Sequence, residues 1–155
     1  MNMQNFKSNI DKAITATCIR IIREPLIYFS EADLQQLLSE EINRIRAIKK
    51  LYPTNIHRGS NSKGVYKTSL LHREYGVGNG KRIDLVIFEP EDVAKINDVN
   101  LKAKGKYLKA AFGIEIGTEK GGNTGSHLSN DIEKLKDLTE NKGIGYVIHM
   151  YKDTD

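Results

Sequence analysis

Apolar residues recur at helical spacing in three stretches of the chain, and each stretch predicts an amphipathic helix. The expected helices cover residues 8–23, 30–50 and 127–141. Pro25 ends the first of them, because the residue before a proline avoids helical backbone angles. Ser30 and Ser126 are the expected N-caps of the other two, since a serine side chain accepts hydrogen bonds from first-turn amides.

Four shorter apolar or alternating stretches predict β-strands. They cover residues 69–76, 82–88, 111–117 and 144–151. A basic loop at 52–68 precedes them, and a polar insert at 89–109 separates the second strand from the third. The order α-α-β-β-β-α-β lets the first three strands form a meander and the last two pair in parallel through a helical crossover. The expected fold class is α/β (α+β), with a mixed central sheet of about four strands flanked by helices.

The turn between the first two strands decides which of their residues face each other. If residues 77–81 form a five-residue loop, Glu74 lies directly opposite Asp84. If Asn79 and Gly80 alone form the turn, the pairing slips by one residue and Glu74 moves to the other face. Two carboxylates placed opposite each other repel unless a cation lies between them. The first alternative therefore makes Glu74 an additional candidate acid.

Length and composition bound the class of protein. A chain of 155 residues predicts a single domain, with residues 1–25 as a helical N-terminal extension and residues 30–151 as the core. No stretch approaches the roughly 18 apolar residues of a membrane helix, so no membrane partner is expected. The single cysteine, Cys18, cannot form an internal disulfide, which suits a reducing compartment. These features predict a soluble, cytoplasmic protein.

The net charge of +4 hides an uneven distribution. Residues 42–82 hold ten Lys and Arg against one acid, residues 102–109 add four lysines, and the remainder therefore carries −9. Clustered positive charge indicates a polyanion partner such as DNA, although solvated lysines without a partner would give the same pattern. The candidate DNA-binding residues are Lys49, Lys50, Arg58, Lys63, Lys67, Lys102, Lys104 and Lys106.

Two carboxylates interrupt the apolar strands of the predicted sheet. Asp84 lies in a strand whose two faces should both be covered, so a metal ion, an arginine or backbone amides must compensate its charge. Glu115 shares a face of the next strand with Gly113 and Gly117, which leave space beside it, although simple alternation also explains an outward polar residue. If the two strands are neighbours, the carboxylates could together hold a hard cation such as Mg²⁺.

Two further acids lie on the helix predicted over residues 30–50. Glu41 falls in the middle of its apolar stripe, and Glu31 lies at the edge, one turn before Leu34. Charged residues on a core-facing stripe usually have a partner, so either acid could join a metal site. Snorkelling to the margin of a sheet or a favourable first-turn dipole interaction would also account for them.

Five short segments resemble, in order, the motifs of the restriction-endonuclease-like PD-(D/E)XK superfamily. They read SEADLQ at residues 30–35, HREYG at 72–76, RIDLVI at 82–87, GIEI at 113–116 and DIEKL at 131–135. The specificity of the resemblance lies in their order and in the matching layout of elements. It implies a mixed sheet between helices and a nuclease that uses Mg²⁺ (or Mn²⁺) to hydrolyse DNA phosphodiester bonds. It further implies that Asp84 and Glu115 bind the metal and that Glu31 assists.

One position departs from the superfamily pattern. The superfamily carries a water-activating lysine two residues after the strand glutamate, where this chain has Gly117. Lys120, just past the strand, or Lys134, on the following helix, could supply the missing catalytic amine. If neither does, the chain would be a catalytically inactive nuclease-like module that binds DNA or a protein partner. An active enzyme of this size that cuts both strands is expected to work as a homodimer or together with other partners.

Other ligand-binding patterns are weaker. Residues 117–124 follow a strand and precede a helix as a P-loop does, but Asn123 takes the place of its essential lysine. The glycines at 76, 78 and 80 lie between two strands rather than between a strand and a helix, unlike a dinucleotide site. The four histidines and one cysteine lack the spacing of a zinc site. The sequence therefore favours a Mg²⁺-dependent endonuclease.

Overall fold

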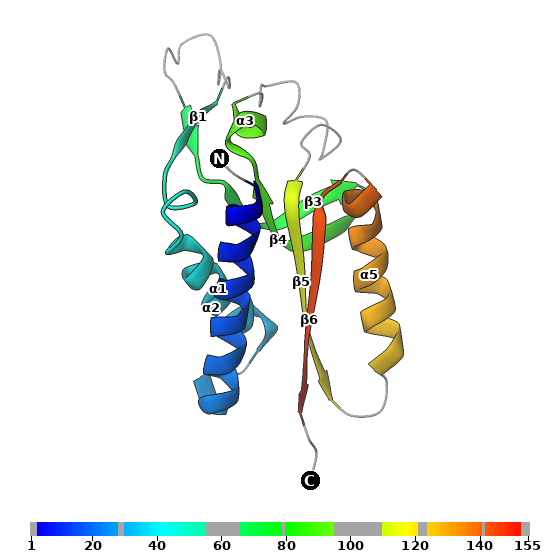
Figure 1. The fold of residues 1–155 in the computed structure, drawn as a ribbon. Coiled ribbons are helices and arrows are strands. Elements are labelled where there is room, and N and C mark those ends of the chain that lie inside the picture. The colour runs from blue at the N-terminus through cyan, green and yellow to red at the C-terminus, as the bar shows by residue number, and fades with distance from the viewer. Residues whose placement is uncertain are drawn as a thin grey trace. The chain divides into compact units, whose positions relative to one another are not determined.

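Two groups of elements make up the chain in the computed structural model (Figure 1). The structure describes residues 3–27, 30–54, 66–78, 80–94, 110–120, 124–140 and 142–152. Contacts within the chain define a first unit, Met1–Lys49, and a second unit, Lys50–Asp155. The helices expected at the N-terminal end belong to the first unit, and every strand of the described residues belongs to the second.

Two helices that contact each other form the first unit. Helix α1 (Met3–Arg23) begins at Met3 rather than at residue 8, because Phe6 extends its buried stripe by one turn. It ends just before Pro25, as expected, and this proline opens the short 3₁₀ helix η1 (Pro25–Ile27).

Helix α2 (Glu31–Asn43) ends well before the predicted residue 50. Beyond Asn43 the amide of Ile45 donates to the carbonyl of Ile42, and the amide of Ile48 donates to that of Ile45. These bonds reach three residues back and form tight turns rather than α-helix. Ile48 is nevertheless buried. Consecutive turns of this kind place a side chain on the same face about every three residues, nearly the period of an α-helix. The spacing of the apolar residues therefore could not show where α2 ends.

Ser30 is the N-cap of α2, as the sequence predicts. Its side chain accepts a hydrogen bond from the Asp33 amide at 3.3 Å, and the Asp33 carboxylate accepts one from the Ser30 amide at 2.8 Å. This reciprocal capping box satisfies two backbone donors that the helix itself leaves unpaired.

Replacing Ser30 with alanine is expected to lower the free energy of unfolding by about 1 kcal/mol, because the Ser30 hydroxyl no longer accepts from the Asp33 amide or donates to the Asp33 carboxylate. Urea denaturation followed by circular dichroism measures this difference. Ser8→Ala, at an exposed position inside α1, is the matched control and should leave stability unchanged or slightly raised. Equal effects of the two substitutions would contradict a capping role for Ser30.

The second unit begins with a two-stranded sheet where the sequence predicted only a loop. Strand β1 (Tyr52–Thr54) pairs antiparallel with β2 (Tyr66–Thr68). Aromatic and threonine residues favour strands, but the Gly, Ser and Asn of the connecting segment dominated the pattern. The predicted insert 89–109 begins with a short helix, α3 (Pro90–Val93). Its remaining residues, 95–109, lie outside the described residues.

The main sheet has four strands in the order β3-β4-β5-β6. Their bounds are β3 (Leu71–Gly78), β4 (Lys81–Phe88), β5 (Ala110–Lys120) and β6 (Ile144–Lys152). The first three form an antiparallel meander, and β5 and β6 are parallel, as the element order predicts. The structure is therefore a mixed α+β fold with a four-stranded mixed sheet and helices. Among the described residues, no helix combines the length and apolar character needed to cross a membrane.

Helix α5 (Thr124–Glu140) makes the crossover between β5 and β6 and packs on the sheet (Figure 1). A Cβ atom at Gly113 would lie 2.9 Å from the Leu135 side chain and 2.8 Å from that of Leu138, so glycine permits this close approach. The helix begins at Thr124, and the prediction that Ser126 caps it was wrong. Glycine at position 125, a poor helix former, hid the first turn from the sequence pattern.

A bulge in β3 settles the pairing of the first hairpin. Gly78 pairs with Lys81, but the register shifts between Gly76 and Gly78, so Gly76 pairs with Arg82. Two residues thus connect the paired ends of the strands, as in the shorter alternative, but the strands pair in the register expected for the five-residue loop. In this register Glu74 is the residue opposite Asp84, as predicted for the longer loop.

The main sheet forks beyond its centre. Within the described residues, the pairing of β4 with β5 ends at Leu85 opposite Ile114. From there β4 continues toward its start at Lys81 paired only with β3, while β5 continues to Lys120 paired only with β6. Asp84 and Glu115 are the next residues on the two arms, and they therefore face each other across the opening of the fork.

Candidate functional site

Asp84 lies at the opening of the fork with its side chain turned toward β5. It is 7% exposed, and its Oδ2 accepts a hydrogen bond from the Ile116 amide at 2.7 Å. A side chain thus takes the place of the backbone partner that a continued ladder would supply. Burial raises the pKa of Asp84, and the Ile116 amide opposes part of that rise. A backbone amide is therefore the compensating partner that the sequence required for this carboxylate.

Glu115 is the most deeply buried acid of the site, at 1% exposed. Its Oε2 accepts a hydrogen bond from Lys134 at 2.9 Å. Its Oε1 is buried and has no hydrogen-bond partner among the described residues. Burial raises the pKa of Glu115 to about 8, the negative charge of Asp84 adds to the rise, and Lys134 opposes it. Helix α5 covers the face that alternation alone would have turned to water.

Lys134 is the lysine that reaches Glu115. It projects from α5 and forms ion pairs with Glu115 Oε2 at 2.9 Å and with Asp131 Oδ1 at 2.8 Å. Burial by itself lowers the pKa of the amine, but its contacts with the two acids outweigh this and raise the pKa above its ordinary value. The amine therefore stays protonated. Lys120, the other candidate, is the last residue of β5, and its side chain lies outside the described residues.

A buried Asp–His pair completes the cluster. His149 Nε2 lies 2.9 Å from Asp131 Oδ2, and the His149 side chain is 4% exposed. His149 pairs with Gly117 in the parallel β5–β6 ladder, and a Cβ atom on Gly117 would lie 2.7 Å from His149 Nε2. The imidazole therefore occupies the space that a side chain at the departing position 117 would need.

Five side chains from β4, β5, β6 and α5 thus form one cluster in the second unit. Glu115, Lys134, Asp131 and His149 are linked by direct contacts, and Asp84 joins them through the Ile116 amide and through its charge. Comparison with models of protein families, with curated proteins and with solved structures found no match. The chemistry of the cluster itself is the basis on which a function can be proposed.

The sequence pattern missed Asp131 and His149 as site residues. Their only signals were the one-turn spacing of Asp131 and Lys134 on the closing helix and the position of His149 in the last strand. His149 was considered only for zinc spacing, which it lacks. Its contact depends on the parallel register of β5 and β6, which no local pattern reveals.

Glu74 borders the site from β3. Its backbone has a φ of 50°, in the left-handed region that non-glycine residues seldom occupy, although it lies inside a strand. Its carboxylate is half exposed and lies 3.9 Å from Arg82. The charge of Glu74 is one cause of the raised pKa of Asp84. The two acids are therefore electrostatically coupled, as the predicted register requires.

The two acids predicted from α2 belong to the first unit. Glu31 is exposed in the first turn of the helix, and Glu41 is half-buried and pairs with Arg44 at 2.8 Å. The cluster described above is built from the second unit alone. Their assistance to a metal ion stays a prediction.

Part of the predicted DNA-binding surface can be located. Lys49, the last residue of the first unit, and Lys50, the first residue of the second, are exposed, as is Lys67 on β2. The remaining candidates lie outside the described residues: Arg58, Lys63, Lys102, Lys104 and Lys106.

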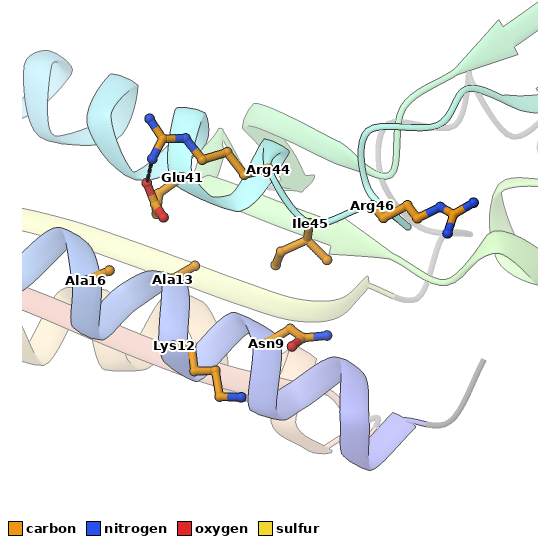
Figure 2. Close-up of a pocket in the computed structure, with 8 residues that line it drawn as sticks. All are labelled: Asn9, Lys12, Ala13, Ala16, Glu41, Arg44, Ile45 and Arg46. Carbon is orange, nitrogen blue, oxygen red and sulfur yellow. Dashed lines mark ion pairs between the residues drawn. The ribbon is translucent and has the colours of Figure 1, made fainter.

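A pocket in the first unit is lined by basic residues that were not among the predicted DNA-binding residues (Figure 2). Lys12 and Asn9 border it from α1, and Arg46 borders it from the turns that follow α2. On its other side Arg44 pairs with Glu41, as the dashed line in Figure 2 marks. The pocket is positively charged overall, which suits contact with phosphate groups.

The carboxylates at the fork are oxygen donors of the type that Mg²⁺ binds. The described residues contain no group of three or more His, Cys, Asp or Glu side chains arranged to hold a metal. Mg²⁺ does not need such a group, because it is usually held by one or two carboxylates and completes its shell with water and substrate phosphates. Glu115 Oε1 is a buried oxygen without a hydrogen-bond partner in the described part of the chain, which is the kind of atom that a cation would satisfy. Asp84 and Glu115 together provide the hard oxygen donors that Mg²⁺ prefers.

Proposed function

We propose that this chain is a Mg²⁺-dependent DNA endonuclease of the restriction-endonuclease-like PD-(D/E)XK type. One observation carries the proposal: at the fork of the mixed sheet, the buried Glu115 pairs with Lys134 from the crossover helix, and the buried Asp84 on the facing arm interacts electrostatically with both. Adjacent acids and an amine are the groups that phosphodiester hydrolysis requires. The element order and the exposed lysines are consistent with it.

The residues of the cluster would have different roles in the reaction. Asp84 and Glu115 would hold the ion, with Asp84 oriented by the Ile116 amide and Glu115 by Lys134. When bound, Mg²⁺ activates a water molecule and neutralises negative charge on the phosphate. Lys134 remains protonated because its pKa is raised, so it acts as a positive charge beside the reacting phosphate and not as a base. Lys134 would thus take the place of the superfamily lysine, with charge stabilisation as its role.

The test is cleavage of supercoiled plasmid by the purified full chain, with Mg²⁺, with Mn²⁺ and with EDTA. We expect nicked or linear product with either metal and none with EDTA. Asp84→Asn, purified in parallel, excludes a contaminating nuclease. Binding without cleavage by the wild type under all metal conditions would favour the inactive DNA-binding module instead. A chain that neither binds nor cleaves DNA would overturn the proposal.

The exposed Lys49 and Lys50 should contribute to DNA affinity. Replacing both Lys49 and Lys50 with glutamine is expected to weaken binding several-fold. It should also reduce the slope of log K against log salt by about one to two, because fewer phosphate contacts form and fewer counterions are released on binding. Fluorescence anisotropy of a labelled duplex in EDTA measures both quantities.

The matched control for this prediction replaces two lysines that already pair with acids on their own helices, Lys7 with Asp11 and Lys136 with Glu133. Lys7→Gln combined with Lys136→Gln removes the same charge and should change the salt slope less. Equal slopes for the two double variants would show that overall charge, and not Lys49 and Lys50 in particular, determines the affinity.

A further inference from the structure

We infer that Asp131 and His149 are positioning residues that hold the Lys134 amine against Glu115 and thereby make up for the absence of a lysine at position 117. The inference rests on the proposed function and adds two residues to it. It explains why this chain combines a glycine on the strand with a lysine on the helix.

The first step concerns space. A Cβ atom at Gly117 would lie 2.7 Å from His149 Nε2 and 3.0 Å from two ring carbons of the same imidazole. Separations under about 3 Å are repulsive, so any side chain at position 117 would have to displace the imidazole. The His149 side chain is 4% exposed and has little room to move. Gly117 and His149 therefore depend on each other.

The second step concerns the carboxylate between them. Asp131 uses one oxygen for each neighbour, with Oδ1 2.8 Å from Lys134 and Oδ2 2.9 Å from His149. A carboxylate held at both oxygens has a fixed orientation. Lys134 lies one helical turn from Asp131 and is held between this carboxylate and Glu115 Oε2. The imidazole thus acts on Lys134 through Asp131.

The third step concerns the flexibility of lysine. A lysine side chain has many accessible rotamers, and its ammonium group has no directional preference of its own. A lysine that enters from a helix therefore needs a second anchor to remain at one carboxylate. Asp131, oriented by His149, is that anchor.

The experiment compares His149→Ala with His149→Gln, because the glutamine amide can still donate to Asp131. We expect His149→Ala to lower the cleavage rate about 10-fold or more, as loss of an outer-shell partner usually does, with DNA affinity unchanged. His149→Gln should retain the rate within about threefold. An alanine variant that is folded by circular dichroism and cleaves as fast as the wild type would overturn the inference.

A second readout does not depend on cleavage. In protein labelled with ¹⁵N-lysine, the ammonium signal that Lys134→Met removes identifies Lys134, and a held amine exchanges slowly enough to be detected. We expect this signal in the wild type and in His149→Gln and its loss in His149→Ala. If the wild type does not cleave DNA but shows this pattern, the proposed function fails and the positioning role stands. An unchanged signal in His149→Ala would contradict the positioning role whatever the activity.

The dependence of Gly117 on His149 gives a double-variant test. Gly117→Ala should lower the rate and weaken the Lys134 signal in the wild type, because the new methyl group displaces the imidazole. In the His149→Ala background the same substitution should cost little more. Additive losses in the two backgrounds would show that position 117 acts independently of the imidazole and would overturn that part of the inference.

Discussion

Replacing Glu115 with glutamine is expected to eliminate most of the Mg²⁺-dependent cleavage and, at the same time, to stabilise the metal-free protein at pH 8. The loss should be at least about 100-fold, because removal of an outer-shell partner alone costs 10–100-fold and Glu115 is a proposed ligand. Stability should rise because the glutamine amide is neutral, and the buried carboxylate must lose its proton at this pH. A plasmid cleavage assay and urea denaturation of the same two proteins measure both effects.

The sign of the stability effect follows from the pKa of Glu115. This pKa is about 8 in the folded chain and has an ordinary value of 4.5. Between these two values the folded protein holds a proton that the unfolded chain has released, so stability falls as the pH rises through that window. The slope from one such group approaches about 1.4 kcal/mol per pH unit. The free energy of unfolding of the wild type should therefore fall relative to that of Glu115→Gln from about pH 5 to pH 8.

Two controls separate this explanation from a general effect of removing a charge. Glu91→Gln, at an exposed position on α3, should follow the pH curve of the wild type. Adding Mg²⁺ at pH 8 should raise the melting temperature of the wild type, because the ion binds the deprotonated carboxylate, and should have little effect on Glu115→Gln. Parallel pH curves for the wild type and Glu115→Gln would contradict the assignment.

The strands of the main sheet and their pairing could be predicted because each depends on local signals, whereas β1 and β2 were missed. Alternating apolar residues located the strands, and the helix between the last two required a crossover that makes them parallel. The hairpin was harder, since a bulge between Gly76 and Gly78 adds one residue to one strand only. Such a residue changes the register without changing the alternation that predicts a strand, so the sequence left the position of Glu74 between two alternatives.

The carboxylates of the site were predictable for a similar reason, and their partners were not. Asp84 and Glu115 interrupt apolar strands, which is a signal that the sequence itself contains. The Asp131–His149 contact depends on where a helix crosses two parallel strands, and it links residues 18 positions apart. Lys134 was one of two possible lysines, because spacing along the chain does not say which amine reaches Glu115. That contact is a property of the packing of α5 on the sheet.

Replacing Lys134 with methionine is expected to lower cleavage about 10²–10³-fold, the usual cost of removing one group that stabilises developing charge. DNA affinity should change less than about threefold, because Lys134 is mostly buried and contributes little to the surface charge. Methionine keeps most of the length and apolar character of the side chain. Single-turnover cleavage with saturating protein measures the rate independently of binding.

The same substitution should destabilise the protein more at pH 8 than at pH 5. At pH 8 it removes the cation that lies between Glu115 and Asp131, and both are buried carboxylates. At pH 5 Glu115 holds a proton, because its pKa is raised to about 8. The neutral carboxyl group loses less stabilisation than a carboxylate would when the amine is removed. Breaking a buried ion pair by deleting one partner typically costs 3–5 kcal/mol, which sets the approximate upper limit at the higher pH.

Lys136→Met is the matched control, since Lys136 lies two residues further along α5 and pairs with Glu133 at an exposed position. It should leave cleavage and its pH dependence unchanged. If Lys134→Met also cleaves at the wild-type rate, the amine on α5 has a structural role only. Loss of cleavage in Lys120→Met would then assign the catalytic role to the lysine at the end of β5, the other candidate that the sequence offered.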